Sequence, residues 1–349
     1  MTDTEAGVTS HDPARPMRCP STSGVEVHSA HFPPRRPGRH PGGGQPVEGL
    51  RMSRGFHHRP VMEEEVVELF APVPPGVVVD ATVGGGGHAA ALLDAHPHLR
   101  LLALDRDAEA LAAAAEALAR FGSRVVGLHH ARFDRLGDLA GGELSGVLFD
   151  LGVSSPQLDR AARGFSYRLD APLDMRMDRS QDRTAADVVN GEDEATLARL
   201  ISDSGERRFA RRIARRIVEA RPLTTTSELA EVVRSAIPAA ARRTGGHPAR
   251  RVFQAVRIAV NDELEVLGPA IDAAITLLAP GGRCVALSYH SGEDRIVKDR
   301  FLAAATGDCV CPPGLPCACG AVPLVRLLNR GARKPSPTET AANPSRGSG

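Results

Sequence analysis

The spacing of hydrophobic and polar positions changes along this chain. The change separates a part in which strands and helices alternate from a part that is mainly helical. Between residues 77 and 151, short apolar runs alternate with helical stretches rich in alanine and leucine. Each apolar run has a strand's length and ends in turn residues, which predicts four strands. The predicted strands are 77–80, 99–105, 124–130 and 144–151. Such alternation is typical of an α/β fold, a parallel sheet that binds ligands at its carboxyl edge.

After residue 157 the pattern becomes mainly helical, and the next convincing strand spans 282–290, with a last one at 322–329. So long an interval exceeds a connecting loop, so we predict a helical domain inserted between the fourth and fifth strands. The predicted parts are a disordered N-terminal extension (1–51), the first part of the core (52–157), the inserted helical domain (158–252), the second part of the core with a cysteine-rich loop at 309–319 (253–330) and a loose C-terminal tail (331–349).

The first 51 residues are rich in Pro, Gly, Arg, His and Ser and have no periodicity. They offer too little apolar surface to offset the entropy of ordering, so we expect disorder. Met52 opens a segment that resembles a natural start, and we hypothesise that translation begins there. The intact mass of the native protein tests this hypothesis.

The composition of the chain limits the classes of protein to which it can belong. The chain has 349 residues and a net charge of +1, so it can bury a sizeable core and any nucleic-acid surface must be local. It contains no apolar run long enough for a membrane span and no apolar N-terminal segment typical of a secretory signal. Four of the six cysteines lie in one short cluster rather than a spread disulfide framework. A cytoplasmic enzyme is therefore expected.

Residues 77–88 join a predicted strand to a helix through four consecutive glycines, Gly84 to Gly87. Glycine lets the backbone turn tightly and approach a ligand, and this turn also fits the dinucleotide fingerprint. Asp105 ends the next strand and supplies a ribose acceptor that NAD and S-adenosylmethionine both require. Asp80 favours S-adenosylmethionine, whose amino acid moiety is charged where NAD carries a pyrophosphate. A methyltransferase is thus favoured over an NAD-dependent oxidoreductase, which remains the alternative.

Residues 205–218 form an amphipathic pattern in which six arginines occupy one half of a helical cylinder. Repeated arginine pairs on one face can bind phosphates. A solvated face paired with nearby carboxylates explains them equally well, and both interpretations stay open.

The C-terminal part contains Cys309, Cys311, Cys317 and Cys319. Four thiols in one loop could bind zinc in a tetrahedral site. The spacing is Cys-x-Cys twice rather than Cys-x-x-Cys, and this short spacing strains a shared tetrahedron. We therefore predict no metal site and keep zinc as the alternative.

Nine segments together resemble the bacterial 16S ribosomal RNA cytosine-N4 methyltransferase family, also called RsmH or MraW. They are HRPV at 58–61, DATVGGGGH at 80–88, ALDRD at 103–107, DLGVSSPQL at 150–158, RGFSY at 163–167, PLDMRMD at 172–178, GERRFARRIA at 205–214, FQAVR at 253–257 and SYHSGEDR at 288–295. The glycine turn is generic, whereas 150–158 and 172–178 are far more specific. The resemblance covers about 56–343, and the N-terminal extension has no counterpart in the family.

The resemblance implies a class I S-adenosylmethionine-dependent methyltransferase, with a Rossmann-like sheet and an inserted helical domain. It implies S-adenosylmethionine as donor and a cytidine in the decoding region of 16S ribosomal RNA, within the small ribosomal subunit, as acceptor. The oligomeric state stays open, with a homodimer among the options. The site residues implied by the resemblance are Gly86, Gly87 and His88 at the methionine end of the donor, Asp105 at its ribose, Phe133 at its adenine, and Asp150 and Gln157 closing the pocket.

Asp150 and His290 are the candidates for the acceptor of the cytosine N4 proton, because both end predicted strands at one edge of the sheet. The alternative is that His290 has a structural function and takes no part in the reaction. The turn 154–156 and Asp294 are further candidates. Two other functions remain open: an RNA-binding protein without catalysis need not bind the donor, and a small-molecule methyltransferase needs no basic insertion.

Overall fold

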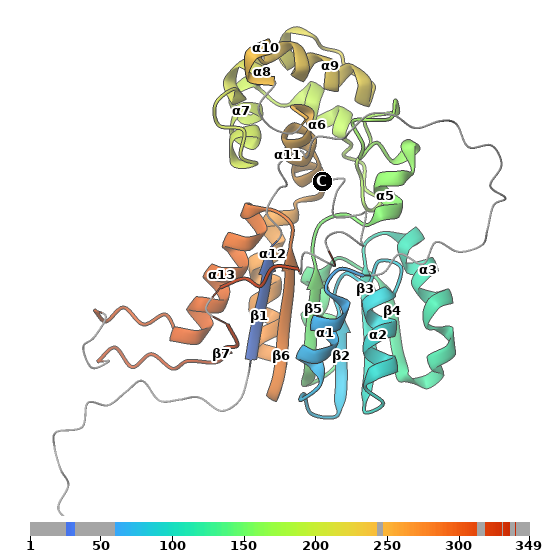
Figure 1. The fold of residues 1–349 in the computed structure, drawn as a ribbon, viewed down its shortest axis with the longest axis vertical. Coiled ribbons are helices and arrows are strands. Elements are labelled where there is room, and N and C mark those ends of the chain that lie inside the picture. Colours follow the sequence, from blue (N-terminus) through green and yellow to red (C-terminus); the bar gives the residue numbers. More distant parts are fainter. Residues whose placement is uncertain are drawn as a thin grey trace, which may run out of the picture.

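The computed structural model describes residues 26–31, 60–242, 247–312, 318–329, 331–335 and 339. Within them a parallel sheet forms the centre of the protein, with the strand order β4-β3-β2-β5-β6-β1-β7 (Figure 1). Its strands are β1 (Glu26–His31), β2 (Gly76–Asp80), β3 (Leu99–Asp105), β4 (Val125–His130), β5 (Leu144–Asp150), β6 (Leu278–Ser288) and β7 (Arg326–Leu327). The expected α/β fold is confirmed.

Helices cover both faces of this sheet because the central strands are apolar at successive positions, and successive side chains point to opposite faces. Leu148 and Val285 pack with Phe70 on one face. Phe149 and Ala286 pack in a second cluster on the other face. The first face carries α1 (Glu63–Phe70), α2 (Gly87–Ala95) and α3 (Ala108–Leu118), and the second carries α4 (Leu136–Leu139), α12 (Glu263–Leu277) and α13 (Ser291–Thr306).

The long interval between β5 and β6 is helical, as the sequence predicts, and α6 to α11 gather at one end of the sheet (Figure 1). Its helices are α5 (Ser155–Asp159), α6 (Ala185–Gly191), α7 (Glu194–Asp203), α8 (Ala210–Glu219), α9 (Thr226–Ala236), α10 (Ala239–Arg242) and α11 (Ala249–Asn261). Short 3-10 helices lie at η1 (Ala119–Arg124), η2 (Phe133–Arg135) and η3 (Ala161–Arg163). The interval has an apolar core of its own, separate from the clusters against the sheet.

The boundary that we predicted at residue 252 is wrong, because it falls inside α11. Val252 and Val256 lie one turn apart on that helix and both belong to the core of the helical part. Since an apolar stripe continues along the whole helix, the helical part extends to Asn261. That buried side chain accepts a hydrogen bond from the Met177 amide (2.9 Å) and donates one to the Met175 carbonyl (2.8 Å).

The described segments near the two ends of the chain differ from what their composition predicts. The expectation of disorder is wrong for Glu26–His31, which pairs in parallel with both β6 and β7. The free edge of β6 supplies backbone partners there that composition does not reveal. The last strand is shorter than 322–329, since only Arg326–Leu327 pairs. The tail is not loose throughout, because the Glu339 carboxylate accepts a hydrogen bond from the Met62 amide (2.6 Å). Met52 and Cys317 lie outside the described residues.

Among the described residues, none of the helices has the length and apolar character needed to cross a membrane.

Candidate active site

A cavity of about 1570 Å³ opens at the carboxyl edge of the sheet. The ends of β2, β3 and β5 form its floor, and residues of the helical part, including Tyr167 and Phe253, line its other side. Known small-molecule sites measure roughly 300–1,000 Å³, so this cavity has room for two ligands. All seven predicted donor-binding residues line it: Gly86, Gly87, His88, Asp105, Phe133, Asp150 and Gln157.

The glycine turn between β2 and α2 has two different functions along its length. Gly84 and Gly86 have φ angles of +51° and +84°, in the left-handed region that favours glycine. A Cβ on Gly85 would meet no atom within 4 Å, so the backbone there is open. A Cβ on Gly87 would come within 2.5 Å of the Pro60 ring. Thus Gly85 offers its backbone to a ligand, whereas Gly87 is required by the packing of Pro60.

Asp105 is fixed at the end of β3 by two backbone amides. Its carboxylate accepts hydrogen bonds from the Gly84 and Asp107 amides, each at 2.8 Å. Burial raises the pKa of this carboxyl above its ordinary value, although both amides oppose the shift. The remaining oxygen lone pairs can accept hydrogen bonds from a diol such as a ribose.

Asp80 lies deeper, at the end of β2, with 1% of its surface exposed. It accepts a hydrogen bond from the Thr82 amide at 3.2 Å. Burial, with smaller contributions from the nearby carboxylates of Asp150 and Asp105, raises the pKa of Asp80 to about 8. Three acidic side chains around one cavity favour a ligand that carries positive charge, because such a ligand stabilises their ionised forms.

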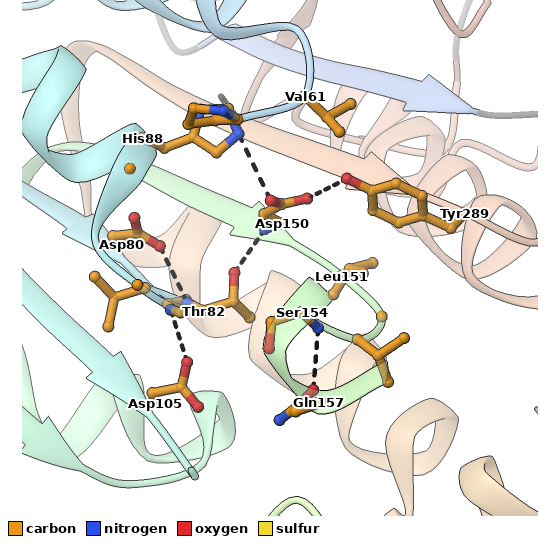
Figure 2. A pocket seen from close by; sticks show the side chains of 18 of the residues that line it. Val61, Asp80, Thr82, His88, Asp105, Asp150, Leu151, Ser154, Gln157 and Tyr289 are labelled. Carbon is orange, nitrogen blue, oxygen red and sulfur yellow. Dashed lines mark hydrogen bonds and ion pairs between the residues drawn. The ribbon is translucent and has the colours of Figure 1, made fainter. Parts of the chain in front are cut away.

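Asp150, at the end of β5, is held by three neighbours (Figure 2). Its amide donates to the Thr82 hydroxyl at 2.6 Å, and its Oδ1 accepts from the Tyr289 hydroxyl at 2.8 Å. The Nε2 of His88 lies 3.6 Å from its Oδ2. The side chain keeps 26% of its surface exposed, so it faces the cavity in a fixed orientation.

Comparisons with known proteins show to which family the chain belongs. Residues 55–349 match the sequence profile of the MraW methylase family. The chain belongs to this family. It is 55% identical over 302 residues to "Ribosomal RNA small subunit methyltransferase H" of Thermobifida fusca, which covers 82% of this chain and 89% of that protein. Proteins of the same name from Frankia alni (53% over 298 residues; 82% of this chain, 91% of the relative) and Heliobacterium modesticaldum (50% over 299 residues; 83% and 95%) are also similar.

The carboxylates fit the methyl donor that a methylase of the MraW family requires. S-adenosylmethionine carries positive charge on its sulfonium and ammonium groups and also has a ribose, and the acidic side chains at this edge are suited to both. A dinucleotide would place a doubly charged pyrophosphate beside the same three carboxylates, at a high electrostatic cost. The NAD-dependent alternative is therefore disfavoured.

Two predicted residues of this MraW-family site are engaged in local structure. His290 begins α13, where its Nδ1 accepts from the Gly292 amide at 3.1 Å and its Nε2 lies 3.0 Å from the Glu293 carboxylate. Gln157 accepts from the Ser154 amide (3.0 Å) and donates to the Asp107 carboxylate (2.8 Å). Both side chains line the cavity, but their ring and amide atoms already bind neighbouring groups.

The buried ion pair of Arg257 and Glu263 adjoins the same wall of the cavity, with two contacts at 2.9 Å. Glu293 lies close to this pair. Although burial opposes its ionisation, His290 and Arg257 hold the pKa of Glu293 below its ordinary value. Glu293 therefore stays ionised, and its carboxylate also accepts from the Tyr289 amide at 2.8 Å. This network fixes the residue that orients Asp150.

A second cavity of about 1210 Å³ adjoins the first on the side of the helical part. Arg250, Gln254, Tyr289 and His290 line both cavities, so the two are neighbours. The predicted amphipathic pattern is confirmed in α8, where Ile213 and Ile217 are buried. The helix begins at Ala210 rather than at 205, so Arg207 and Arg208 precede it. The arginines on its opposite side, Arg211, Arg212, Arg215 and Arg216, are all exposed.

Sequence reasoning missed three contributors to the site. Thr82 and Tyr289 orient Asp150, and their positions in the DATVGGGGH and SYHSGEDR segments could have suggested this. Lys334 lines the cavity from the C-terminal tail, more than 180 residues from Asp150 in sequence, and no local pattern indicates it.

Proposed function

We propose that this protein transfers a methyl group from S-adenosylmethionine to N4 of a cytidine in the decoding region of 16S ribosomal RNA. Membership of the MraW methylase family supports a methyl transfer. The names of the similar proteins support ribosomal RNA of the small subunit as the acceptor. The choice of N4 and of cytidine rests on the resemblance of the DLGVSSPQL and PLDMRMD segments.

One observation carries the proposal: Asp150, an oriented carboxylate, faces a cavity with room for a donor and a nucleotide. The geometry fits a reaction that needs an acceptor for a proton beside a cationic donor. S-adenosylmethionine, when bound, supplies a methyl group on a positively charged sulfur.

For donor binding, we assign the ribose hydroxyls to Asp105 and the positively charged end to the region of Asp80 and His88. The open backbone at Gly85 lets a ligand approach closely. Phe133, which packs edge to face on Phe149 at 5.9 Å between ring centroids, offers an apolar surface for the adenine. Gln157 would close this side through its cavity-facing surface.

For the acceptor, the chemistry requires help because the N4 lone pair of cytosine is delocalised into the ring. A carboxylate that accepts a hydrogen bond from the amine localises that pair and takes its proton as the N–C bond forms. Asp150 is our candidate for this acceptor. Tyr289 and His88 hold its two oxygens, and the turn at Ser154 follows closely along the chain. We assign His290 a positioning function, because it caps the N-terminus of α13 and follows Tyr289 directly in the chain.

A base in folded RNA must leave its stack to reach a donor inside a cavity, so we propose that a flipped cytidine enters. We propose that the nucleotide enters through the second cavity. Arg250 and Gln254 line both this cavity and the first one. Tyr167 lines the first cavity and stacks on His247 at 4.5 Å, so its ring could extend a stack of bases. We propose that the arginines of α8 bind phosphates beside this route.

The direct test is transfer of radiolabelled methyl from S-adenosylmethionine to small ribosomal subunits that lack the modification, followed by nucleoside analysis. We expect label in N4-methylcytidine and none in a reaction without enzyme. Label in another nucleoside would reject the N4 assignment. No transfer, with the donor still bound by calorimetry, would reject the proposed acceptor while leaving a methylase. A parallel reaction with free 16S ribosomal RNA distinguishes naked RNA from the assembled subunit as substrate.

A further inference from the structure

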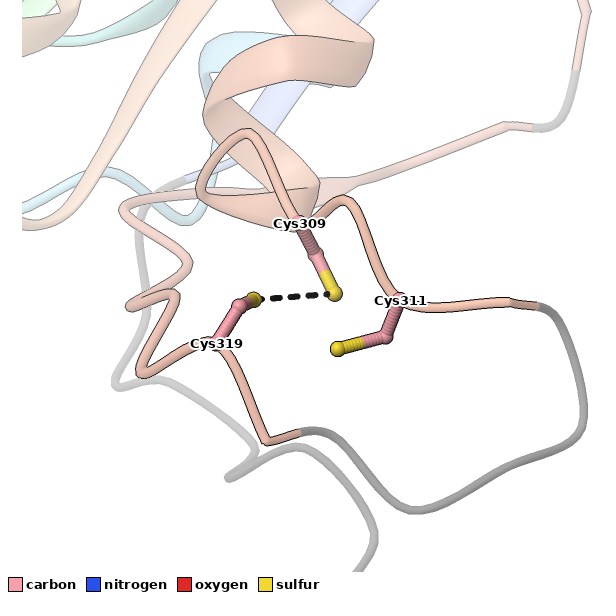
Figure 3. Close-up of side chains that lie close together, drawn as sticks. All are labelled: Cys309, Cys311 and Cys319. Atoms are coloured by element: carbon pink, nitrogen blue, oxygen red, sulfur yellow. Dashed lines mark hydrogen bonds between the residues drawn. The ribbon is translucent and has the colours of Figure 1, made fainter.

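Three cysteines of the loop after α13 converge at a site that the proposed function does not use (Figure 3). The sulfur atoms of Cys309, Cys311 and Cys319 all lie within 4.8 Å of one another. Those of Cys309 and Cys319 are 3.5 Å apart. None of the three forms a disulfide bond, and none lines the cavity at the sheet edge.

These distances match the requirements of a metal better than those of a disulfide. Zinc binds thiolates at about 2.3 Å, so two sulfurs of one tetrahedron lie about 3.8 Å apart. The observed spread of 3.5 Å to within 4.8 Å brackets that value. A disulfide needs about 2.05 Å and joins only two of the three sulfurs. We expected the short Cys-x-Cys spacing to strain a shared tetrahedron, but the chain bends between Cys309 and Cys311 and the sulfur atoms come together (Figure 3).

A further contact resembles the surroundings of metal-bound sulfur. The Ala318 amide donates to the Cys311 sulfur at 3.3 Å. A backbone amide directed at sulfur stabilises its deprotonated form, and ligands of metal sites commonly accept such bonds.

The base of the loop is already closed by backbone contacts. The Leu324 amide donates to the Ala304 carbonyl at 2.8 Å. Gly307 ends α13 with a φ of +61°, and a Cβ there would come within 2.6 Å of the Val322 backbone. Residues 308–312 therefore leave α13 and residues 318–324 return to it, and the three sulfurs lie between these two segments.

We propose that Cys309, Cys311 and Cys319 bind one structural Zn²⁺ ion. Each thiol loses its proton to solvent as its sulfur–zinc bond forms. The ion links the two ends of the loop and thereby fixes the C-terminal end of α13 against the chain that leads into β7. Four-coordinate zinc takes one more ligand. Cys317 lies outside the described residues, and the number of sulfur ligands is a result of the test.

The experiment measures metal in the full chain purified without chelator from zinc-supplemented medium. We expect about one Zn²⁺ per chain by elemental analysis, as for a structural site. Cys309→Ser, Cys311→Ser and Cys319→Ser should each retain less than about a fifth of that zinc, because thiolates carry the affinity. Cys284→Ala is the matched control and should retain it all, since Cys284 is buried in the core beside the sheet.

Two further readouts keep the result interpretable. Replacing zinc by Co²⁺ should produce an intense thiolate-to-metal absorption band in the wild type and in Cys284→Ala, with an intensity that reports the number of sulfur ligands. Circular dichroism and donor titration identify any variant that fails to fold. The proposal is overturned if the folded wild type holds no zinc and gives no cobalt band, or if the three serine variants retain as much metal as Cys284→Ala. A disulfide found in the freshly purified wild type would also overturn it.

Discussion

The sheet edge and the helical part place opposite charges in opposite environments. At the sheet edge, Asp80, Asp105 and Asp150 are gathered around one cavity, and burial raises the pKa of the first two. On α8, arginines such as Arg211 and Arg212 stand exposed to solvent. The net charge of +1 conceals this separation.

A charged group costs more free energy at the buried sheet edge than on the exposed face of a helix. Like charges that share a buried site raise one another's pKa, and such an arrangement persists only where a ligand or reaction uses it. Exposed arginines on a helix change the stability of the fold little, and they attract phosphates over a longer range. Donor chemistry should therefore depend on the sheet edge, and RNA binding on the helical part.

The largest expected effect comes from Asp150→Asn. The variant keeps the shape of the side chain but cannot take the N4 proton, so methyl transfer should fall by about 10²- to 10⁴-fold. Donor affinity should change by only a few fold. Single-turnover transfer and donor calorimetry check both expectations. Asp138→Asn, an exposed carboxylate paired with Arg135 on α4, is the control and should behave as wild type.

Asp105→Asn should produce the next largest effect, on donor affinity. An amide can accept through one atom only, so it cannot serve two backbone amides and a ribose at once. We expect the dissociation constant of the donor to rise by roughly 10- to 100-fold, since a buried acceptor to the ribose is lost. RNA affinity, measured by filter binding, should stay the same. An equal loss of RNA affinity would show that the two regions are not separable.

Arg211→Ala with Arg212→Ala tests the helical part. If each arginine contacts one phosphate, the slope of log affinity against log salt should decrease by about 1.5. RNA binding should weaken most at low salt. The control is Arg135→Ala with Arg300→Ala, which removes the same charge from the outside of the sheet domain. If both pairs reduce the slope equally, RNA binding has no preference for α8.

Asp80→Asn tests the buried carboxyl of the sheet edge through the pH dependence of stability, measured without donor. The pKa of Asp80 is about 8 in the folded protein, against roughly 3.9 in an unfolded chain. Between these values the folded state holds a proton that the unfolded state has lost, so the stability of the wild type falls as pH rises from about 4 to 8. Asp80→Asn has no carboxyl group at this position, so its stability does not fall with pH for this reason. Its melting temperature without ligand should therefore exceed that of the wild type by an amount that grows up to about pH 8 and is constant above it. A difference independent of pH would contradict the assignment.

Much of this comparison could be predicted from the sequence. The strand–helix alternation indicated the parallel sheet, and the position of Asp80, Asp105 and Asp150 after apolar runs placed them at one edge. The amphipathic pattern correctly separated the two faces of α8. These features are local and periodic, and periodicity is what a sequence displays most directly.

What could not be predicted depends on contacts between distant segments. The pairing of Glu26–His31 with β6 joins residues about 257 apart. Lys334 reaches the cavity, and Tyr289 orients Asp150, through the tertiary fold alone. His290 was expected at the edge for its chemistry, but its distances to Gly292 and Glu293 indicate that it begins a helix. Convergence of the cysteines likewise follows from a bend that spacing does not reveal.

The most direct test of the separation is one calorimetric titration of S-adenosylmethionine into the wild type, Asp105→Asn and the Arg211→Ala, Arg212→Ala variant under identical conditions. We expect Asp105→Asn to bind the donor roughly 10- to 100-fold more weakly, whereas the double arginine variant should bind it as the wild type does. Loss of donor affinity in the arginine variant, or unchanged affinity in Asp105→Asn, would show that the sheet edge and the helical part do not have separate functions.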